Sequence, residues 1–200
     1  MNSKNFKIYF DCGSSKVRAS AHHKENHKIS FFTESDFFFD SLNLNVEIQK
    51  IISFLEKNTN EYLDDINLMI DTPDMLSINI SISKKLNGSN LKKRDIQFLI
   101  MDAKQQVMRN HSNLFINHII IRNYKINDTD HTFLPENVNC DLISLDILFI
   151  CIPKKFIDYY KKIFSSLNIS INQIYCSSYA KSISYKENFS TIKNISFIDM

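Results

Sequence analysis

The 200-residue sequence is poor in the residues that mark several enzyme classes. It contains two glycines, three prolines and no tryptophan. With only Gly13 and Gly88, it holds neither a Walker-type lysine loop nor a Gly-x-Ser-x-Gly turn. P-loop chemistry and serine-hydrolase triads are therefore not indicated.

Long apolar segments are also lacking. The longest run, Leu145 to Pro153, is much shorter than the roughly 20 residues that a membrane-spanning helix needs. The N-terminus is polar and has no apolar core of a signal peptide, so we expect none. From these features we expect the chain to be cytosolic.

Neither charge nor cysteine dominates the composition. Lys and Arg number 24 against 22 Asp and Glu, and the formal net charge of +2 gives no reason to expect nucleic acid. The four cysteines, Cys12, Cys140, Cys151 and Cys176, are far apart, and each lies in or beside an apolar run. We expect buried reduced thiols and no disulfide framework.

A hydrophobic content of 44% and an aromatic content of 12% are enough to build a core. Alternating segments predict strands at 7–10, 17–22 and 29–33, and a buried strand at 66–71 follows. Between them, residues 46–57 place Ile48, Ile51, Ile52 and Leu55 on one helical face. This order predicts a mixed sheet with both hairpin and crossover connections.

The middle of the chain predicts one helix on three strands. A strand at 77–83 is expected to end at Asn87-Gly88, and the following elements are a helix at 91–110, a strand at 118–126, a polar loop at 127–137 and a strand at 142–152. The last part predicts an amphipathic helix at 154–168, a short strand around 169–174 and a helix at 178–187.

The segment FKIYFDCGSS, residues 6 to 15, carries the most specific signal. It predicts a hairpin that presents Asp11 and a turn of Gly13, Ser14 and Ser15. Gly13 can adopt a positive φ, and successive amides in such a turn can bind an anion. Asp11 suits a hydrated magnesium ion. We interpret the turn as a nucleotide-phosphate loop, although Asp-x-Gly-Ser also occurs in hairpins where the aspartate only caps the turn.

Three histidines, His22, His23 and His27, surround a second predicted turn. Neighbouring residues of a strand face opposite sides, and no cysteine or carboxylate cluster accompanies the histidines. We expect no metal site there.

FDCGSSKVRA resembles the first phosphate motif of the actin-like ATPases, and most of all that of the FtsA cell-division family. Residues 78–106 are similar to that family's entry into an extra subdomain, and residues 118–128 to the next strand. Residues 177–185 resemble the helix that joins the two halves of an actin fold. Residues 194–200, NISFIDM, resemble the opening of the second phosphate motif.

The resemblance implies an α/β actin-like (ribonuclease-H-like) subdomain with an inserted small α+β subdomain, truncated before the second lobe. It implies a first lobe at 1–80 and 152–192, an inserted subdomain at 81–151 and the start of a second lobe at 193–200. Family members have more glycine between residues 30 and 80 than this chain, which leaves the detailed shape of the cleft open.

The resemblance also implies the ligands. ATP with Mg²⁺ would be held by Asp11, Gly13, Ser14, Ser15 and Lys16, and the magnesium by water between Asp11 and Asp199. No catalytic residue is assigned, and turnover would be slow at most. Because only one side of the cleft precedes Met200, we expect weak or absent ATP binding by these residues alone.

The implied role is a division protein at the cytoplasmic face of the inner membrane. It would self-assemble into filaments, tether FtsZ through segments beyond Met200, including a membrane-binding one, and recruit other divisome proteins. Two alternatives stay open. One is another actin-like assembly ATPase, such as the pilus protein PilM, and the other is an interaction module whose hairpin binds no nucleotide.

Overall fold

The computed structural model describes residues 4–13, 15–36, 41–135 and 138–188, and side chains from residue 44 onward in the first helix. The chain forms two compact units. Unit 1 comprises Met1–Pro73 and Phe156–Met200, and unit 2 comprises Asp74–Lys155. The domain limits inferred from the resemblance remain predictions, and residues 193–200 lie outside the described part.

Unit 1 is built on a five-stranded mixed sheet in the order β3-β2-β1-β4-β9. Its first three strands are antiparallel neighbours, whereas β4 is parallel to both β1 and β9. This is the strand order of a ribonuclease-H-like lobe, and the predicted mixed sheet is confirmed. The strands are β1 (Phe6–Cys12), β2 (Lys16–His23), β3 (Ile29–Asp36), β4 (Asp65–Ile70) and β9 (Ser170–Cys176).

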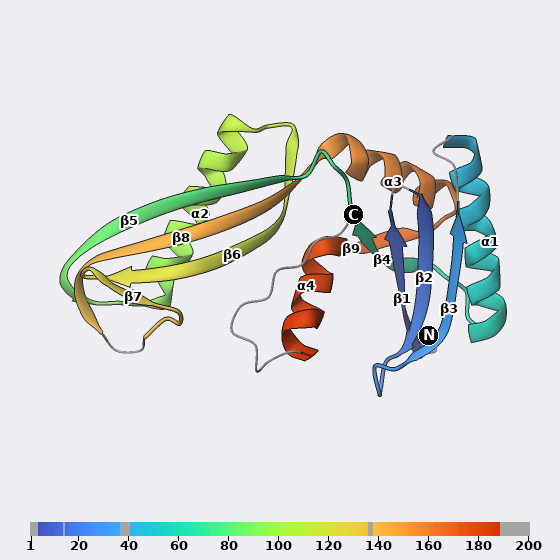
Figure 1. Cartoon of the computed structure of the whole chain (residues 1–200), viewed down its shortest axis with the longest axis horizontal. Coiled ribbons are helices and arrows are strands. Elements are labelled where there is room, and N and C mark those ends of the chain that lie inside the picture. The colour runs from blue at the N-terminus through green and yellow to red at the C-terminus, as the bar shows by residue number, and fades with distance from the viewer. Residues whose placement is uncertain (1–3, 14, 37–40, 136–137, 189–200) are drawn as a thin grey trace. The chain divides into compact units, whose positions relative to one another are not determined.

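Helices α1 (Ser41–Thr59) and α3 (Lys154–Ser166) cover one face of this sheet (Figure 1). On that face Phe10 of β1 meets Phe164 of α3 edge to face, with ring centroids 5.2 Å apart. Ser35 of β3 donates a hydrogen bond of 2.5 Å to Glu47 of α1. The predicted apolar face of α1 is confirmed, since all four of its residues are buried: Ile48, Ile51, Ile52 and Leu55.

The other face of the sheet is polar. Alternation along β1 and β2 puts Tyr9, Asp11, Arg18 and Ser20 on the side away from α1 and α3. Helix α4 (Ser177–Asn188) begins directly after β9. Because this face is polar, polar side chains can lie close together at either end of its strands without being buried in the core.

Unit 2 is a four-stranded antiparallel sheet in the order β5-β8-β6-β7 with one helix, α2 (Lys93–Asn110), lying along its long strands (Figure 1). Helix and sheet share one core, in which Leu99, Ala103 and Phe149 are almost fully buried. The strands are β5 (Leu76–Asn90), β6 (Leu114–Ile126), β7 (Thr129–His131) and β8 (Asn139–Pro153).

Two sequence predictions for unit 2 are wrong. Strand β5 does not end at Asn87-Gly88 but pairs with β8 as far as Asn90. A shift in register between Lys85 and Ser89 accommodates the two turn-forming residues, which adopt φ values of 50° and 78°. The predicted polar loop at 127–137 contains a fourth strand, β7, because Asn127 and Asp128 form a tight turn with positive φ.

Among the described residues, no helix is both long enough and apolar enough to cross a membrane.

Candidate functional site at the carboxyl ends of the parallel strands

The polar residues of unit 1 meet where its parallel strands end. Strands β1, β4 and β9 run in the same direction, so their carboxyl ends lie at one edge of the sheet. Asp11 lies at this end of β1, Asp71 follows β4, and Ser177 and Ser178 follow β9. Ligands of open α/β sheets bind at such an edge.

Two residues hold the Asp11 carboxylate: Ser177, which is distant in the sequence, and Arg18 of the neighbouring strand β2. The Ser177 hydroxyl donates a hydrogen bond of 2.6 Å to Asp11 Oδ1, and Arg18 Nη1 lies 3.6 Å from Asp11 Oδ2. The Asp11 side chain is only 14% exposed and Ser177 only 2%. The carboxylate therefore has a fixed position at the edge of the sheet.

Asp71 accepts a hydrogen bond from a serine of the same helix, as Asp11 does. The Ser178 hydroxyl donates to Asp71 Oδ2, while Asp71 Oδ1 accepts the Thr72 N–H at 3.1 Å. Both serines open helix α4, whose N-terminus carries a partial positive charge. Two carboxylate–serine pairs thus lie at the start of one helix, which stabilises negative charge at this position.

The hairpin between β1 and β2 is tight. The Gly13 N–H donates a hydrogen bond of 3.0 Å to the Lys16 carbonyl. Gly13 does not use the positive φ that glycine permits, and a Cβ there would lie 3.5 Å from that carbonyl, at ordinary contact distance. Ser15 is exposed, and Ser14 lies outside the described residues.

Lys16 contacts carboxylates of β3. Its Nζ lies 3.2 Å from Asp36 and 3.7 Å from Glu34. The hydrogen bond with Asp36, and then the two negative charges, raise the pKa of Lys16. Arg18 also contacts Glu34, at 3.3 Å, so it lies between that carboxylate and Asp11. Both cations of the hairpin are thus held by acidic partners on this face.

The thiol next to the site takes no part in it. Cys12 points into the core, and burial, followed by the charge of Asp11, raises its pKa. Burial likewise raises the pKa of Cys151 to about 11. All four cysteines are buried and free, as the sequence predicts, so they remain protonated at neutral pH.

The arrangement offers oxygen ligands and a nearby guanidinium. Carboxylates and hydroxyls suit a magnesium ion that keeps its waters, and an arginine suits phosphate. The sequence predicted Asp11, Gly13, Ser15 and Lys16 in one hairpin, and the structure places them there. Asp199, the predicted partner of Asp11, lies outside the described residues. In the part of the chain with assigned positions, no group of three or more His, Cys, Asp or Glu could hold a bare metal ion.

Sequence reasoning missed Asp71, Ser177 and Ser178 as site residues. A usable signal was present, since all three are polar residues within two positions of the end of a strand of the sheet. The same pattern identified Asp11. What the sequence did not show was that β1, β4 and β9 are adjacent and parallel.

No protein-family model matches the chain, and no curated protein sequence does. Among solved structures, it is similar to a chain of the PilM–PilN type IV pilus biogenesis complex, with a TM-score of 0.62 and 6% identity. That match covers 93% of this chain and 52% of the other, so the chain spans about half the length of its counterpart. Together with the strand order, it shows the predicted actin-like fold with an inserted subdomain.

Two other matches have TM-scores below 0.5. One is the cytoplasmic domain of EpsL, an inner membrane component of the type II secretion system of Vibrio cholerae, with a TM-score of 0.46, 4% identity, and coverage of 86% of this chain and 57% of that one. The other is a Bacteroides thetaiotaomicron protein with an actin-like ATPase fold, with a TM-score of 0.41, 15% identity, and coverage of 93% and 57%.

Proposed function

We propose that this chain forms the first lobe of an actin-like assembly ATPase and supplies one side of its nucleotide site. The observation that supports this is the meeting of Asp11 and Asp71, each bonded to a serine of α4, at the carboxyl edge of the parallel strands. In the full protein, ATP with Mg²⁺ would bind between this lobe and a second lobe and would hold the two together.

The residues of this chain would divide the work by chemistry. Asp11 holds a hydrated magnesium ion, with Asp199 as its partner from the second lobe. The turn of Gly13, Ser14 and Ser15 would bind phosphate oxygens, and Lys16 would add positive charge nearby. Because Lys16 forms ion pairs with Asp36 and Glu34, it would attract the phosphate through its charge alone. Direct contact with the phosphate would require these ion pairs to break.

Titration of the chain with Mg·ATP, followed through its backbone amide resonances, tests the site. We expect weak binding, with shifts at Gly13, Ser15 and Asp71, and loss of the magnesium-dependent part in Asp11→Asn. Asp74→Asn is the matched control, since Asp74 forms an exposed ion pair with Lys155 in unit 2. Absence of shifts at this edge, or equal shifts in Asp11→Asn, would contradict the proposal.

In one form of this role the protein acts in division. The sequence resemblance to the FtsA family supports ATP-dependent filament assembly, attachment of FtsZ to the inner membrane and recruitment of divisome proteins. Co-sedimentation with FtsZ polymers tests this form, and a full-length protein that stays in the supernatant while the FtsZ polymers pellet would exclude it.

A second form is a component of a pilus machine. It is supported by the similarity of fold to the chain from the PilM–PilN complex, which extends over 93% of this chain. Binding to PilN without binding to FtsZ would favour this form. Full activity of an Asp11→Asn protein in either setting would instead favour an interaction module that needs no nucleotide.

A further inference from the structure

The amino ends of the same parallel strands form a second hollow. A pocket of about 430 Å³ lies where β1, β4 and β9 begin, and we call it the amino-end pocket. Its polar lining includes Lys4, Lys7, Lys24, Glu61, Asp65 and Asn67. Because β1 has seven residues, this pocket lies roughly 20 Å from the carboxyl edge. It is a separate place on unit 1.

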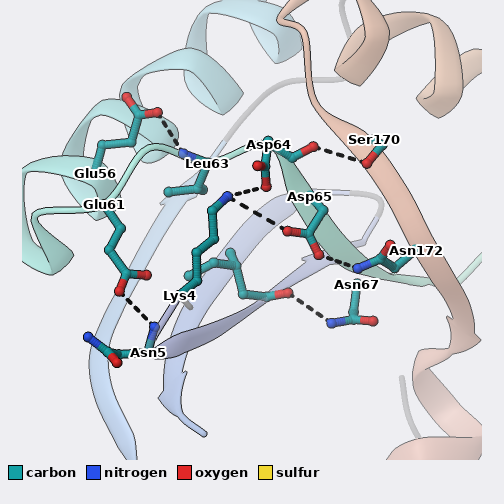
Figure 2. Close-up of polar contacts among 11 residues, drawn as sticks. Lys4, Asn5, Glu56, Glu61, Leu63, Asp64, Asp65, Asn67, Ser170 and Asn172 are labelled. Carbon is teal, nitrogen blue, oxygen red and sulfur yellow. Dashed lines mark hydrogen bonds and ion pairs between the residues drawn. The ribbon is translucent and has the colours of Figure 1, made fainter. Parts of the chain in front are cut away.

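Backbone and side-chain bonds fix the walls of this pocket (Figure 2). The Asn5 N–H donates a hydrogen bond of 2.7 Å to Glu61, and the Asn5 carbonyl accepts the Lys24 N–H at 2.8 Å. Asn172 of β9 donates to the Asp65 carboxylate. The entry to β1, the turn after β2 and the loop after α1 are therefore tied together around the pocket.

The acidic residues of the lining are engaged by protein groups. Lys4 pairs with Asp64 and also lies 3.9 Å from Asp65 (Figure 2). Glu61 accepts the Asn5 N–H. These contacts fix the positions of the carboxylates and of Lys4, whose single positive charge offsets one of the negative charges of Asp64, Asp65 and Glu61. The pocket keeps two further cations.

Those two cations are Lys7 and Lys24. Neither forms an ion pair with any residue that the structure describes. Both also line a neighbouring hollow of about 250 Å³ that is bordered by His22, His23 and His27. Two lysines between two hollows place two positive charges within reach of one ligand, and such a pair can bind the oxygens of a dianion.

Asn67 gives the pocket a polar floor. It interrupts the apolar strand β4 and is 7% exposed, although burial of an amide in a central strand is unfavourable. Its Nδ2 donates a bond of 3.3 Å to the Ile8 carbonyl, its one side-chain hydrogen bond among the described residues. Its cross-strand neighbour Gln173 also lines the pocket. Two carboxamides side by side offer donors and acceptors to hydroxyl groups.

We propose that the amino-end pocket binds a small phosphorylated polyol, with its phosphate between Lys7 and Lys24 and its hydroxyls on Asn67 and Gln173. The volume lies in the range of sites for small molecules, about 300–1,000 Å³. Two lysines that form no ion pair within the described part of the chain match the double charge of a phosphate monoester better than the single charge of a carboxylate. This ligand is additional to the nucleotide of the proposed function.

The test is a titration of the chain with glycerol phosphate, followed through backbone amide resonances. We expect saturable shifts at Lys7, Lys24 and Asn67, weaker binding of inorganic phosphate and none of glycerol. Lys7→Gln and Lys24→Gln should each weaken binding by about tenfold, equivalent to about 1.4 kcal/mol. Lys28→Gln is the matched control, because Lys28 is an exposed residue of the same turn that lines neither hollow.

Three results would overturn the inference. They are shifts confined to Gly13 and Asp71, equal affinity of the Lys24→Gln and Lys28→Gln proteins, or equal affinity for inorganic and glycerol phosphate. Both lysines are surface residues, so far-ultraviolet circular dichroism should show both variants folded. Asp11→Asn separates this site from the nucleotide site, since it should abolish magnesium-dependent ATP shifts and leave glycerol phosphate binding unchanged.

Discussion

Unit 1 pairs β1, β4 and β9 in parallel, whereas every strand pair of unit 2 is antiparallel. In unit 1, residues 11, 71 and 177 therefore meet at one edge, although more than half of the chain separates the first from the last. In unit 2, the long strands β5, β8 and β6 build a sheet under one helix (Figure 1). The parallel strands of unit 1 therefore bring polar side chains together at their carboxyl ends. The antiparallel strands of unit 2 form a sheet that packs against a helix.

The largest expected effect tests whether the two units are separate in stability. Phe149→Ala in unit 2 and Phe10→Ala in unit 1 each remove a fully buried ring and should lower the free energy of unfolding by about 3–5 kcal/mol. Amide hydrogen exchange should show faster opening in the mutated unit only. Equal acceleration in β1 and β8 by either variant would mean that the units unfold together.

A smaller effect concerns a charge that belongs to unit 2. The hydrogen bond from Lys84 to Asp95, at 2.8 Å, and then the bond from the Lys92 N–H, lower the pKa of Asp95. A lowered pKa in the folded protein stabilises it above the unfolded pKa of about 3.9, and this is lost as the pH falls through the folded value. Asp95→Asn should cost about 1–2 kcal/mol at neutral pH and flatten the acid limb of the stability curve.

Urea unfolding at a series of pH values measures this change. Asp128→Asn is the control, because Asp128 is exposed and its ion pair with Lys125 is worth little. A steep acid limb that persists in Asp95→Asn would show that other carboxylates govern the acid stability of unit 2.

The smallest effect compares the two glycines. Gly88 has a φ of 78°, so Gly88→Ala should cost about 1 kcal/mol through backbone strain. Gly13→Ala should change stability by less than about 0.5 kcal/mol, because a Cβ there meets the Lys16 carbonyl at 3.5 Å without strain. Thermal unfolding measures both. If Gly13→Ala lowered the melting temperature more than Gly88→Ala, the strain would lie at Gly13 and not at Gly88.

Much of the fold could be predicted from periodicity. The apolar face of α1 and the alternation of β1 and β2 are local patterns, and the structure follows them. The errors in predicting the strands of unit 2 arose where hydrogen bonding between strands outweighs the turn preference of the local residues. Asn87-Gly88 is a turn signal, yet the ladder with β8 extends β5 beyond it. In the candidate site, Asp11 could be found in its motif, but Asp71 and Ser177 could not be assigned without knowing which strands are neighbours.

The sequence by itself determined most of the strands and helices and the polar hairpin of β1 and β2. That they form an actin-like lobe with an insertion was implied by the resemblance of short motifs. The elements follow from residue spacing, since side-chain burial repeats with the period of each helix or strand. Only the tertiary structure decided that Lys16 pairs with Asp36, that Ser177 bonds Asp11, and that a lysine-lined pocket occupies the amino ends of the strands. Such contacts depend on strand order and register, which place distant residues together and have no local signature.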